Sequence, residues 1–300
     1  MARLTAALAL LLFASCFPGA RPDSGSGELI LCGDKEVYMI DLAAGGRKVW
    51  GWRAEDRPEI PAELRKRFGT TDDCKPVDGG ASILVTSSGG GVALVERATG
   101  RAVFWAAVEN AHSAEMLPGG RILVAGSTGK TGNRLALFDR SRPERELASY
   151  PLHGAHGAAW DPESRIVWAL GETELHTYAL EGWETATPSL ALTRRIDLPD
   201  AGGHDLRPVP GTRKLVLTTR KRVWTLDRGG PMFEAHDRLG GLAGVKSVDV
   251  HPGTGRIAFV QAETSWWSSR VRFLSPEGEF PLAGERIYKA RWGAGAAPVR

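Results

Sequence analysis

Three histidines and a lysine recur at similar intervals and in the same local context. His112, His156, His204 and Lys246 each precede a proline by six positions, and the intervals between them are 44, 48 and 42 residues. Imidazole and ammonium groups gathered in one place bind anions such as carboxylate, sulfate or phosphate, and imidazole also acts as an acid or a base. We therefore interpret these four residues as candidates for one ligand site.

Each of the four residues begins a similar segment of chain. An apolar run follows each proline, as in residues 122–125 and 215–218, and a second apolar run that ends in a turn comes next, as in residues 137–139. Four short strands in about 40–48 residues are typical of one blade of a β-propeller. The spacing of the candidate residues is therefore the spacing of the blades.

The two ends of the chain complete the ring. Residues 29–52 contain three predicted strands without an innermost one, whereas residues 286–292 form an innermost strand without its blade. Tyr288 lies 42 residues after Lys246, which keeps the period, and a further blade begins near Asp72 and Asp73. We predict an all-β fold, a six-bladed β-propeller over residues 28–292 whose C-terminal strand joins the N-terminal blade, with a tail at 293–300.

Innermost strands of a propeller line the central channel, so equivalent residues of successive blades meet at one mouth. Tyr288 or Lys289 takes the place of the histidine in one blade, and Asp72 or Asp73 takes it in another. Crowded groups that can carry positive charge are expected to lower one another's proton affinity. The predicted ligand-binding residues are His112, His156, His204, Lys246, Tyr288, Lys289 and Asp73.

Three functions fit such a mouth. The first is binding of a small anionic or carbohydrate-like ligand by the His/Lys-lined pocket. The second is an enzyme in which His112, His156 and His204 are the catalytic candidates, for group transfer such as sulfuryl transfer or for hydrolase or lyase chemistry. The third is a protein-interaction module, in which the histidines only stabilise the blades through hydrogen bonds to backbone carbonyls.

The same histidines also suggest a metal site, because three imidazoles can ligate zinc. Lys246 follows them in the register, and an ammonium group repels a divalent cation. We therefore expect no metal and no other cofactor.

Loops of two kinds are expected to shape the mouth. Residues 53–71 form a long insert whose 61–68 segment predicts a short helix with Pro61 near its start, and Arg65, Lys66 and Arg67 would add positive charge there. Trp266 and Trp267 lie in another of these loops, and exposed tryptophans beside a polar pocket often stack on rings.

The N-terminus has the pattern of an export signal. A basic start at Arg3 precedes an uncharged apolar run to Ala14, and Cys16 ends a segment that resembles a bacterial lipobox. We predict a signal peptide over residues 1–16, lipidation at Cys16 and a flexible tether over residues 17–27, with ordinary cleavage near residues 18–20 as the alternative. The protein is then periplasmic or extracellular, and it contacts a membrane only through a lipid anchor.

Composition restricts the partners further. The chain has 38 basic and 35 acidic residues, a formal net charge of +3, which is too balanced for the basic face of a nucleic-acid-binding protein.

Cys32 and Cys74 are expected to be buried thiols, although a pair outside the cytoplasm can also form a disulfide. The oligomeric state stays open.

The repeat motif carries two resemblances. The register motif, with residues 119–124 after His112, resembles an uncharacterised family of exported bacterial six-bladed propellers, which implies the fold and no reaction. Residues 112–120 and 204–211 are also similar to repeats of bacterial arylsulfotransferases, periplasmic enzymes in which a channel histidine carries the sulfuryl group. That second resemblance implies His112 and His204 as the histidines to test, although no register position here is an arginine.

Overall fold

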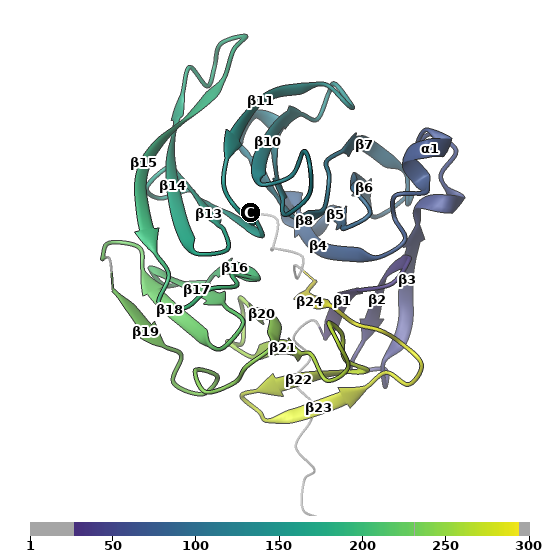
Figure 1. The fold of residues 1–300 in the computed structure, drawn as a ribbon. Helices are drawn as coiled ribbons and strands as arrows, with labels where there is room; N and C mark the ends of the chain where they lie inside the picture. The colour runs from purple at the N-terminus through teal and green to yellow at the C-terminus, as the bar shows by residue number, and fades with distance from the viewer. Residues whose placement is uncertain (1–26, 231, 294–300) are drawn as a thin grey trace, which may run out of the picture.

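Within the part of the chain that the structure describes, short apolar segments between turns rich in glycine and aspartate form 24 strands. The computed structural model describes residues 27–230 and 232–293 and arranges them as six four-stranded antiparallel sheets around a central channel (Figure 1). The prediction of a six-bladed β-propeller is confirmed. The predicted signal peptide with Cys16 lies outside the described residues, as do positions 17–26 of the tether and 294–300 of the tail.

Blades 1 to 3 contain the N-terminal strands and the C-terminal one, with the innermost strand given first. Blade 1 contains β24 (Lys289–Trp292), β1 (Glu28–Cys32), β2 (Glu36–Asp41) and β3 (Arg47–Arg53). Blade 2 contains β4 (Thr71–Val77), β5 (Ser82–Ser87), β6 (Gly91–Glu96) and β7 (Ala102–Ala107). Blade 3 contains β8 (Ala111–Leu117), β9 (Arg121–Gly126), β10 (Arg134–Asp139) and β11 (Glu146–Pro151).

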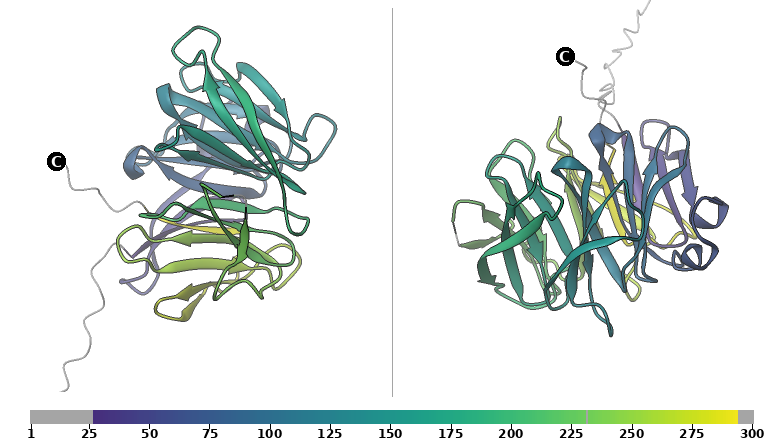
Figure 2. Two further views of the ribbon diagram at one scale, coloured as in Figure 1. Left: turned by 90° about the vertical axis from the view of Figure 1, so that its left-hand side faces the viewer. Right: turned by 90° about the horizontal axis from the view of Figure 1, so that it is seen from above.

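Blades 4 to 6 follow in chain order. Blade 4 contains β12 (Gly157–Asp161), β13 (Ile166–Leu170), β14 (Glu174–Glu181) and β15 (Ser189–Asp197). Blade 5 contains β16 (Asp205–Pro208), β17 (Lys214–Thr218), β18 (Val223–Asp227) and β19 (Phe233–Ala235). Blade 6 contains β20 (Val245–Val250), β21 (Ile257–Gln261), β22 (Arg270–Leu274) and β23 (Gly278–Pro281). Figure 2 shows the blades from the side.

The ring closes where β24 pairs with β1. The pairing is antiparallel, with Leu29 opposite Trp292 and Cys32 opposite Lys289. Strands from the two ends of the chain therefore share blade 1, as predicted, and no unpaired innermost edge is left in that blade.

Apolar side chains fill the space between neighbouring blades. Six buried clusters, one at each junction, make up the core, and the cluster between blades 1 and 2 contains Trp52, Phe68 and Ile83. Cys32 and Cys74 belong to that cluster as buried free thiols, as expected. Because each sheet is covered by its neighbours on both faces, the ring itself rather than any single blade is the stable unit.

The insert before blade 2 folds as predicted but lies elsewhere. α1 (Ala62–Arg65) begins after Pro61 and sits at the outer edge of the ring (Figure 1). Arg65 and Lys66 line a separate cavity of about 530 Å³ beside it. The expectation that these two cations enrich the channel mouth is therefore wrong, because Leu64 and Phe68 hold the helical part of the insert in the core between blades 1 and 2. Among the described residues, no helix is long and apolar enough to cross a membrane.

A buried ion network ties the closing strand to the other blades. The Arg291 guanidinium of β24 donates to Asp73 Oδ1 of blade 2, Nε at 3.0 Å, and to both carboxylate oxygens of Asp205 of blade 5, at 2.6 and 2.8 Å. The side chains of Arg291, Asp73 and Asp205 are at most 3% exposed. Removing one partner of such a network leaves an uncompensated buried charge, so the network fixes β24 in its place.

We predict that Arg291→Met lowers the free energy of unfolding by about 3–5 kcal/mol and the melting temperature by roughly 6–10 °C. Arg286→Met is the matched control, because Arg286 also joins the C-terminal segment to blade 1 but pairs with Asp34 at the surface. Its cost should stay within about 1 kcal/mol. Equal melting temperatures for the two variants in calorimetry would contradict the role of the network in closure.

Candidate functional site

A cavity at the mouth of the channel collects side chains from all six blades. Its volume is about 380 Å³, and we call it the mouth cavity. One residue from the start of each innermost strand contributes, and these six register residues are Asp72, His112, His156, His204, Lys246 and Tyr288. Thr70, Ser88, Asn110 and Trp266 from the loops complete the lining.

Five of the predicted ligand-binding residues are therefore brought together: His112, His156, His204, Lys246 and Tyr288. The other two, Asp73 and Lys289, do not line the cavity. The structure places them one position further into the channel, where both are fully buried and engaged in ion pairs. Of the two alternatives for this blade, Asp72 rather than Asp73 lines the cavity.

A β-bulge at the start of each innermost strand explains how neighbouring residues occupy two levels. In β4, β8 and β20 the pairing register shifts by one residue at Asp72, His112 and Lys246. In a regular strand, consecutive side chains point to opposite faces. The extra residue of a bulge changes that alternation, so a register residue and the residue after it both turn toward the channel.

The other three blades have the same arrangement. The backbone N–H of His204 donates to the carbonyl of Thr218 at 2.9 Å, while Asp205 is also opposite Thr218 in the sheet. His156 with Gly157, and Tyr288 with Lys289, face a single partner residue in the same way. The bulge is thus repeated in all six blades.

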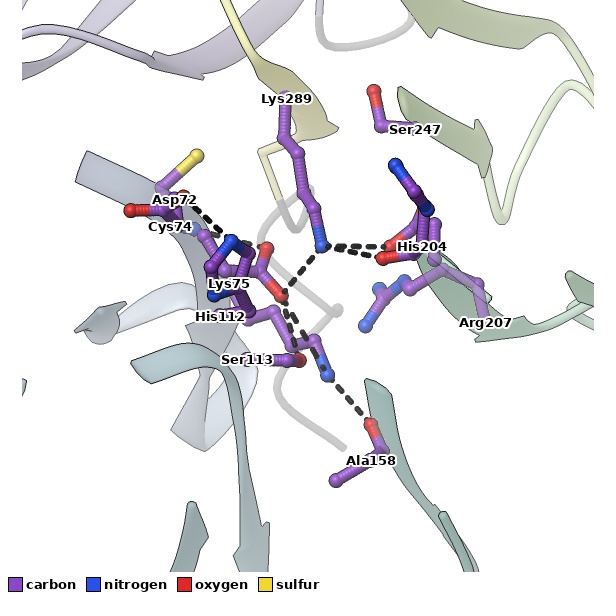
Figure 3. A network of polar contacts seen from close by, with 12 residues as sticks. Asp72, Cys74, Lys75, His112, Ser113, Ala158, His204, Arg207, Ser247 and Lys289 are labelled. Carbon is purple, nitrogen blue, oxygen red and sulfur yellow. Dashed lines mark hydrogen bonds and ion pairs between the residues drawn. The ribbon is translucent and has the colours of Figure 1, made fainter. Parts of the chain in front are cut away.

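The second level forms the floor of the mouth cavity. Lys289 Nζ donates to the backbone carbonyl of His204 and to Asp205 Oδ1, both at 3.3 Å, and lies 3.8 Å from Asp73 Oδ2 (Figure 3). Ser113 Oγ donates to Asp73 Oδ2 at 2.8 Å. Lys75, one level deeper, donates to Glu115 at 3.1 Å and to the carbonyl of Ala158 at 2.6 Å. The channel below the cavity is therefore filled by paired charges.

The three imidazole rings stack side by side along the cavity wall. The ring centroids of His112 and His156 are 4.0 Å apart, and those of His156 and His204 are 5.0 Å apart with an interplanar angle of 25°. Within residues 27–230 and 232–293, no group of three or more His, Cys, Asp or Glu side chains has metal-site geometry.

Burial lowers the proton affinity of the positively chargeable groups. It lowers the pKa of His156 well below its usual value and, with the nearby charge of Lys246, lowers the pKa of His204 to about 3. Burial, together with the charges of Arg220 and Lys289, lowers the pKa of Lys246 to about 8. The predicted mutual depression is present, but desolvation is its largest cause. At neutral pH, Lys246 is therefore charged while His156 and His204 are neutral.

Lys246 differs from the other cations of the channel in having no counterion. Lys75, Arg207, Lys289 and Arg291 each pair with a carboxylate within 3.3 Å. Among the described residues, no carboxylate forms an ion pair with Lys246, which is half-buried in the cavity wall. A partly desolvated ammonium without a partner is ready to bind an anion.

The sequence matches a family of unknown function (DUF6528) over residues 30–297. The chain belongs to this family. The resemblance to an uncharacterised family of six-bladed propellers is thereby confirmed. No curated protein matches the sequence, and the resemblance to arylsulfotransferase repeats stays a prediction.

Several lining residues were missed by sequence reasoning. Thr70 lies at the end of the 53–71 insert, which was expected to shape the mouth, whereas Ser88 and Asn110 lie in loops that were not singled out. The sequence did indicate Asp72, because Asp72 and Asp73 both lie about one blade repeat before His112. The alternation of a regular strand gives no reason to prefer one of these two aspartates for the mouth. Trp266, which the sequence did suggest, lines the cavity at 5.9 Å from the Tyr288 ring.

Proposed function

We propose that the mouth cavity binds a small anionic, sugar-like ligand, with Lys246 as the anchor for its negative group. The observation that carries this proposal is the half-buried Lys246 ammonium, which has no carboxylate partner among the described residues. A ligand anion would supply that partner. A charge-assisted hydrogen bond of this kind contributes about 1.5–3 kcal/mol.

The remaining lining suits a hydroxylated ring. Trp266 offers an aromatic face beside Tyr288, and Ser88, Thr70 and Asn110 offer donors and acceptors around it. Aromatic faces stack on sugar rings, while scattered hydroxyl and amide groups match the hydroxyls of a sugar. A sugar acid such as D-glucuronate combines both features and is the probe that we choose.

The N-terminal pattern supports binding outside the cytoplasm as part of this proposal. Residues 1–16 support an exported protein, and Cys16 supports a lipid anchor as its only contact with a membrane. A binding domain held on a tether at a cell surface would meet its ligand in the periplasm or the surrounding medium.

We predict that Lys246→Met reduces the stabilisation of the protein by D-glucuronate in a thermal shift assay by about half or more. At a ligand concentration of about 100 times the Kd, the wild type should gain about 2.7 kcal/mol, and the variant should bind at least about tenfold more weakly. Lys130→Met is the matched control, since Lys130 is an exposed lysine in the loop after β9. D-Glucose, which lacks the carboxylate, should stabilise the wild type less.

Stabilisation that is equal in Lys246→Met and the wild type would overturn the proposed anchor. So would an equal loss in Lys130→Met, because it would show that general surface charge rather than one site attracts the anion.

The pH dependence of binding should identify the same lysine. Because the ammonium is the form that binds an anion, affinity should be full below the pKa of about 8 and decline as the pH rises through it. Between pH 7 and pH 9 we expect a loss of about tenfold, whereas an ordinary lysine with a pKa of about 10.4 stays charged throughout. Thermal shifts with D-glucuronate at both pH values measure this, and unchanged affinity at pH 9 would contradict the role of Lys246.

A further inference from the structure

The three histidines of the mouth cavity do not have equivalent surroundings. The Nδ1 atoms of His112 and His204 each face a backbone carbonyl, whereas that of His156 faces Ser127 Oγ. Only His112 has an acid at its other nitrogen. A backbone carbonyl only accepts hydrogen bonds, so a ring nitrogen that faces one must carry hydrogen. The hydrogen-bond partners therefore indicate where the protons are.

His204 presents an unprotonated nitrogen to the cavity. Its Nδ1 lies 2.7 Å from the carbonyl oxygen of Gly202 and donates to it. No hydrogen bond or ion pair reaches Nε2 from any of the described residues, and the pKa of about 3, lowered mainly by burial, keeps that nitrogen unprotonated. The lone pair of Nε2 is the only one left to this ring. It becomes a better proton acceptor when a bound anion neutralises Lys246, because the charge of Lys246 also lowers the pKa of His204.

His112 has the opposite arrangement. Its Nδ1 lies 3.0 Å from the carbonyl oxygen of Asn110, while its Nε2 lies 3.3 Å from Asp72 Oδ1. A lone pair facing a carboxylate oxygen at that distance in a buried site is repulsive. A proton on either partner turns the contact into an attraction, so Asp72 and His112 together retain a proton.

Asp72 is positioned to share that proton. Its other oxygen, Oδ2, accepts a hydrogen bond from the backbone N–H of Ser88, which fixes the carboxylate beside the ring. Burial raises the pKa of Asp72, while the neighbouring His112 acts in the opposite direction. The other titratable groups facing the couple are His156, Tyr288 and, from below, Lys289. Of these, Lys289 is paired in the floor.

We propose that the mouth cavity is an acid–base centre in which the Asp72–His112 couple donates a proton and His204 Nε2 accepts one. This inference rests on the proposed function, because the substrate would be the anion that Lys246 holds. The couple and the acceptor lie in the same row of rings, with His156 between them. A bound anion in the cavity can therefore meet both.

The reaction class is a proton shift within the bound anion. His204 Nε2 takes a proton from one atom of the substrate, and the electron pair of that bond stays with the substrate. The couple gives its proton to a second atom, which accepts the displaced electron pair. Solvent exchange then returns a proton from His204 to the couple, so atoms and charge balance without a co-reactant.

Diethyl pyrocarbonate tests the assignment without a known substrate, because it acylates only an unprotonated imidazole nitrogen. At about pH 6, in a buffer without added small anions, His204 of the full-length protein should be modified at least about tenfold faster than His112. Peptide mass spectrometry gives the two rates. Asp72→Asn, which removes the charge and keeps the size, should raise the His112 rate severalfold, and Asp72→Ala should do the same. Asp78→Asn, at an exposed aspartate, is the matched control.

Similar rates for His112 and His204 in the wild type would overturn the inference, and this comparison needs no variant to fold. An unchanged His112 rate in both Asp72 variants would overturn it as well. Either result leaves the anchor intact if D-glucuronate still stabilises the protein through Lys246. Loss of that stabilisation, with the rates as expected, would instead contradict the proposed ligand.

Discussion

The guanidinium of Arg291 holds two carboxylates from different blades in the centre of the ring. Asp73 and Asp205 both contact it within 3.0 Å, and all three side chains are almost completely buried. Arg291 lies on β24, the strand that closes blade 1 without any covalent link to it. The closure of the ring and the shape of the channel therefore depend on the same set of charges.

This network also sets what the mouth cavity can do. It fills the channel below the register residues, so a ligand meets a closed floor rather than a pore. It places Lys289 directly under His204, where the ammonium accounts for part of the low proton affinity of the histidines. Among the described residues, the floor cations are paired internally, whereas Lys246 at the mouth has no carboxylate partner.

The β-bulges allow one innermost strand to supply a residue to the mouth cavity and the next residue to the ion network of the floor. In the five blades other than blade 4, whose second residue is Gly157, the innermost strand offers two consecutive side chains to the channel, and the first faces the cavity while the second lies below it. Asp72 and Asp73 show the division clearly, since one contacts His112 and the other contacts Arg291. A propeller whose innermost strands were regular would turn one member of each pair away from the channel.

The repeat made most of the fold predictable from the sequence. A basic residue six positions before a proline marked the start of each of four blades, and the same period identified Tyr288 as the fifth member. The bulges could not be predicted, because nothing in the local sequence distinguishes two consecutive channel residues from an alternating pair. For that reason the sequence left Asp72 or Asp73, and Tyr288 or Lys289, as alternatives for the mouth, where Asp72 and Tyr288 lie.

The position of the insert at residues 53–71 could not be predicted from the sequence either. Its helix was expected from Pro61, but Leu64 and Phe68 bury themselves in the core between blades 1 and 2 and hold it at the outer edge. Local sequence predicted the element, and tertiary packing decided its place. The positions of the loop residues that line the cavity, such as Ser88, are likewise decided by tertiary packing.

Crystals grown with selenate test the central claim most directly, because the anomalous signal of selenium locates the anion without assumptions about the ligand. The account predicts an anomalous peak inside the mouth cavity, with an oxygen within hydrogen-bonding distance of Lys246 Nζ. Anomalous peaks at exposed arginines together with an empty cavity would contradict it.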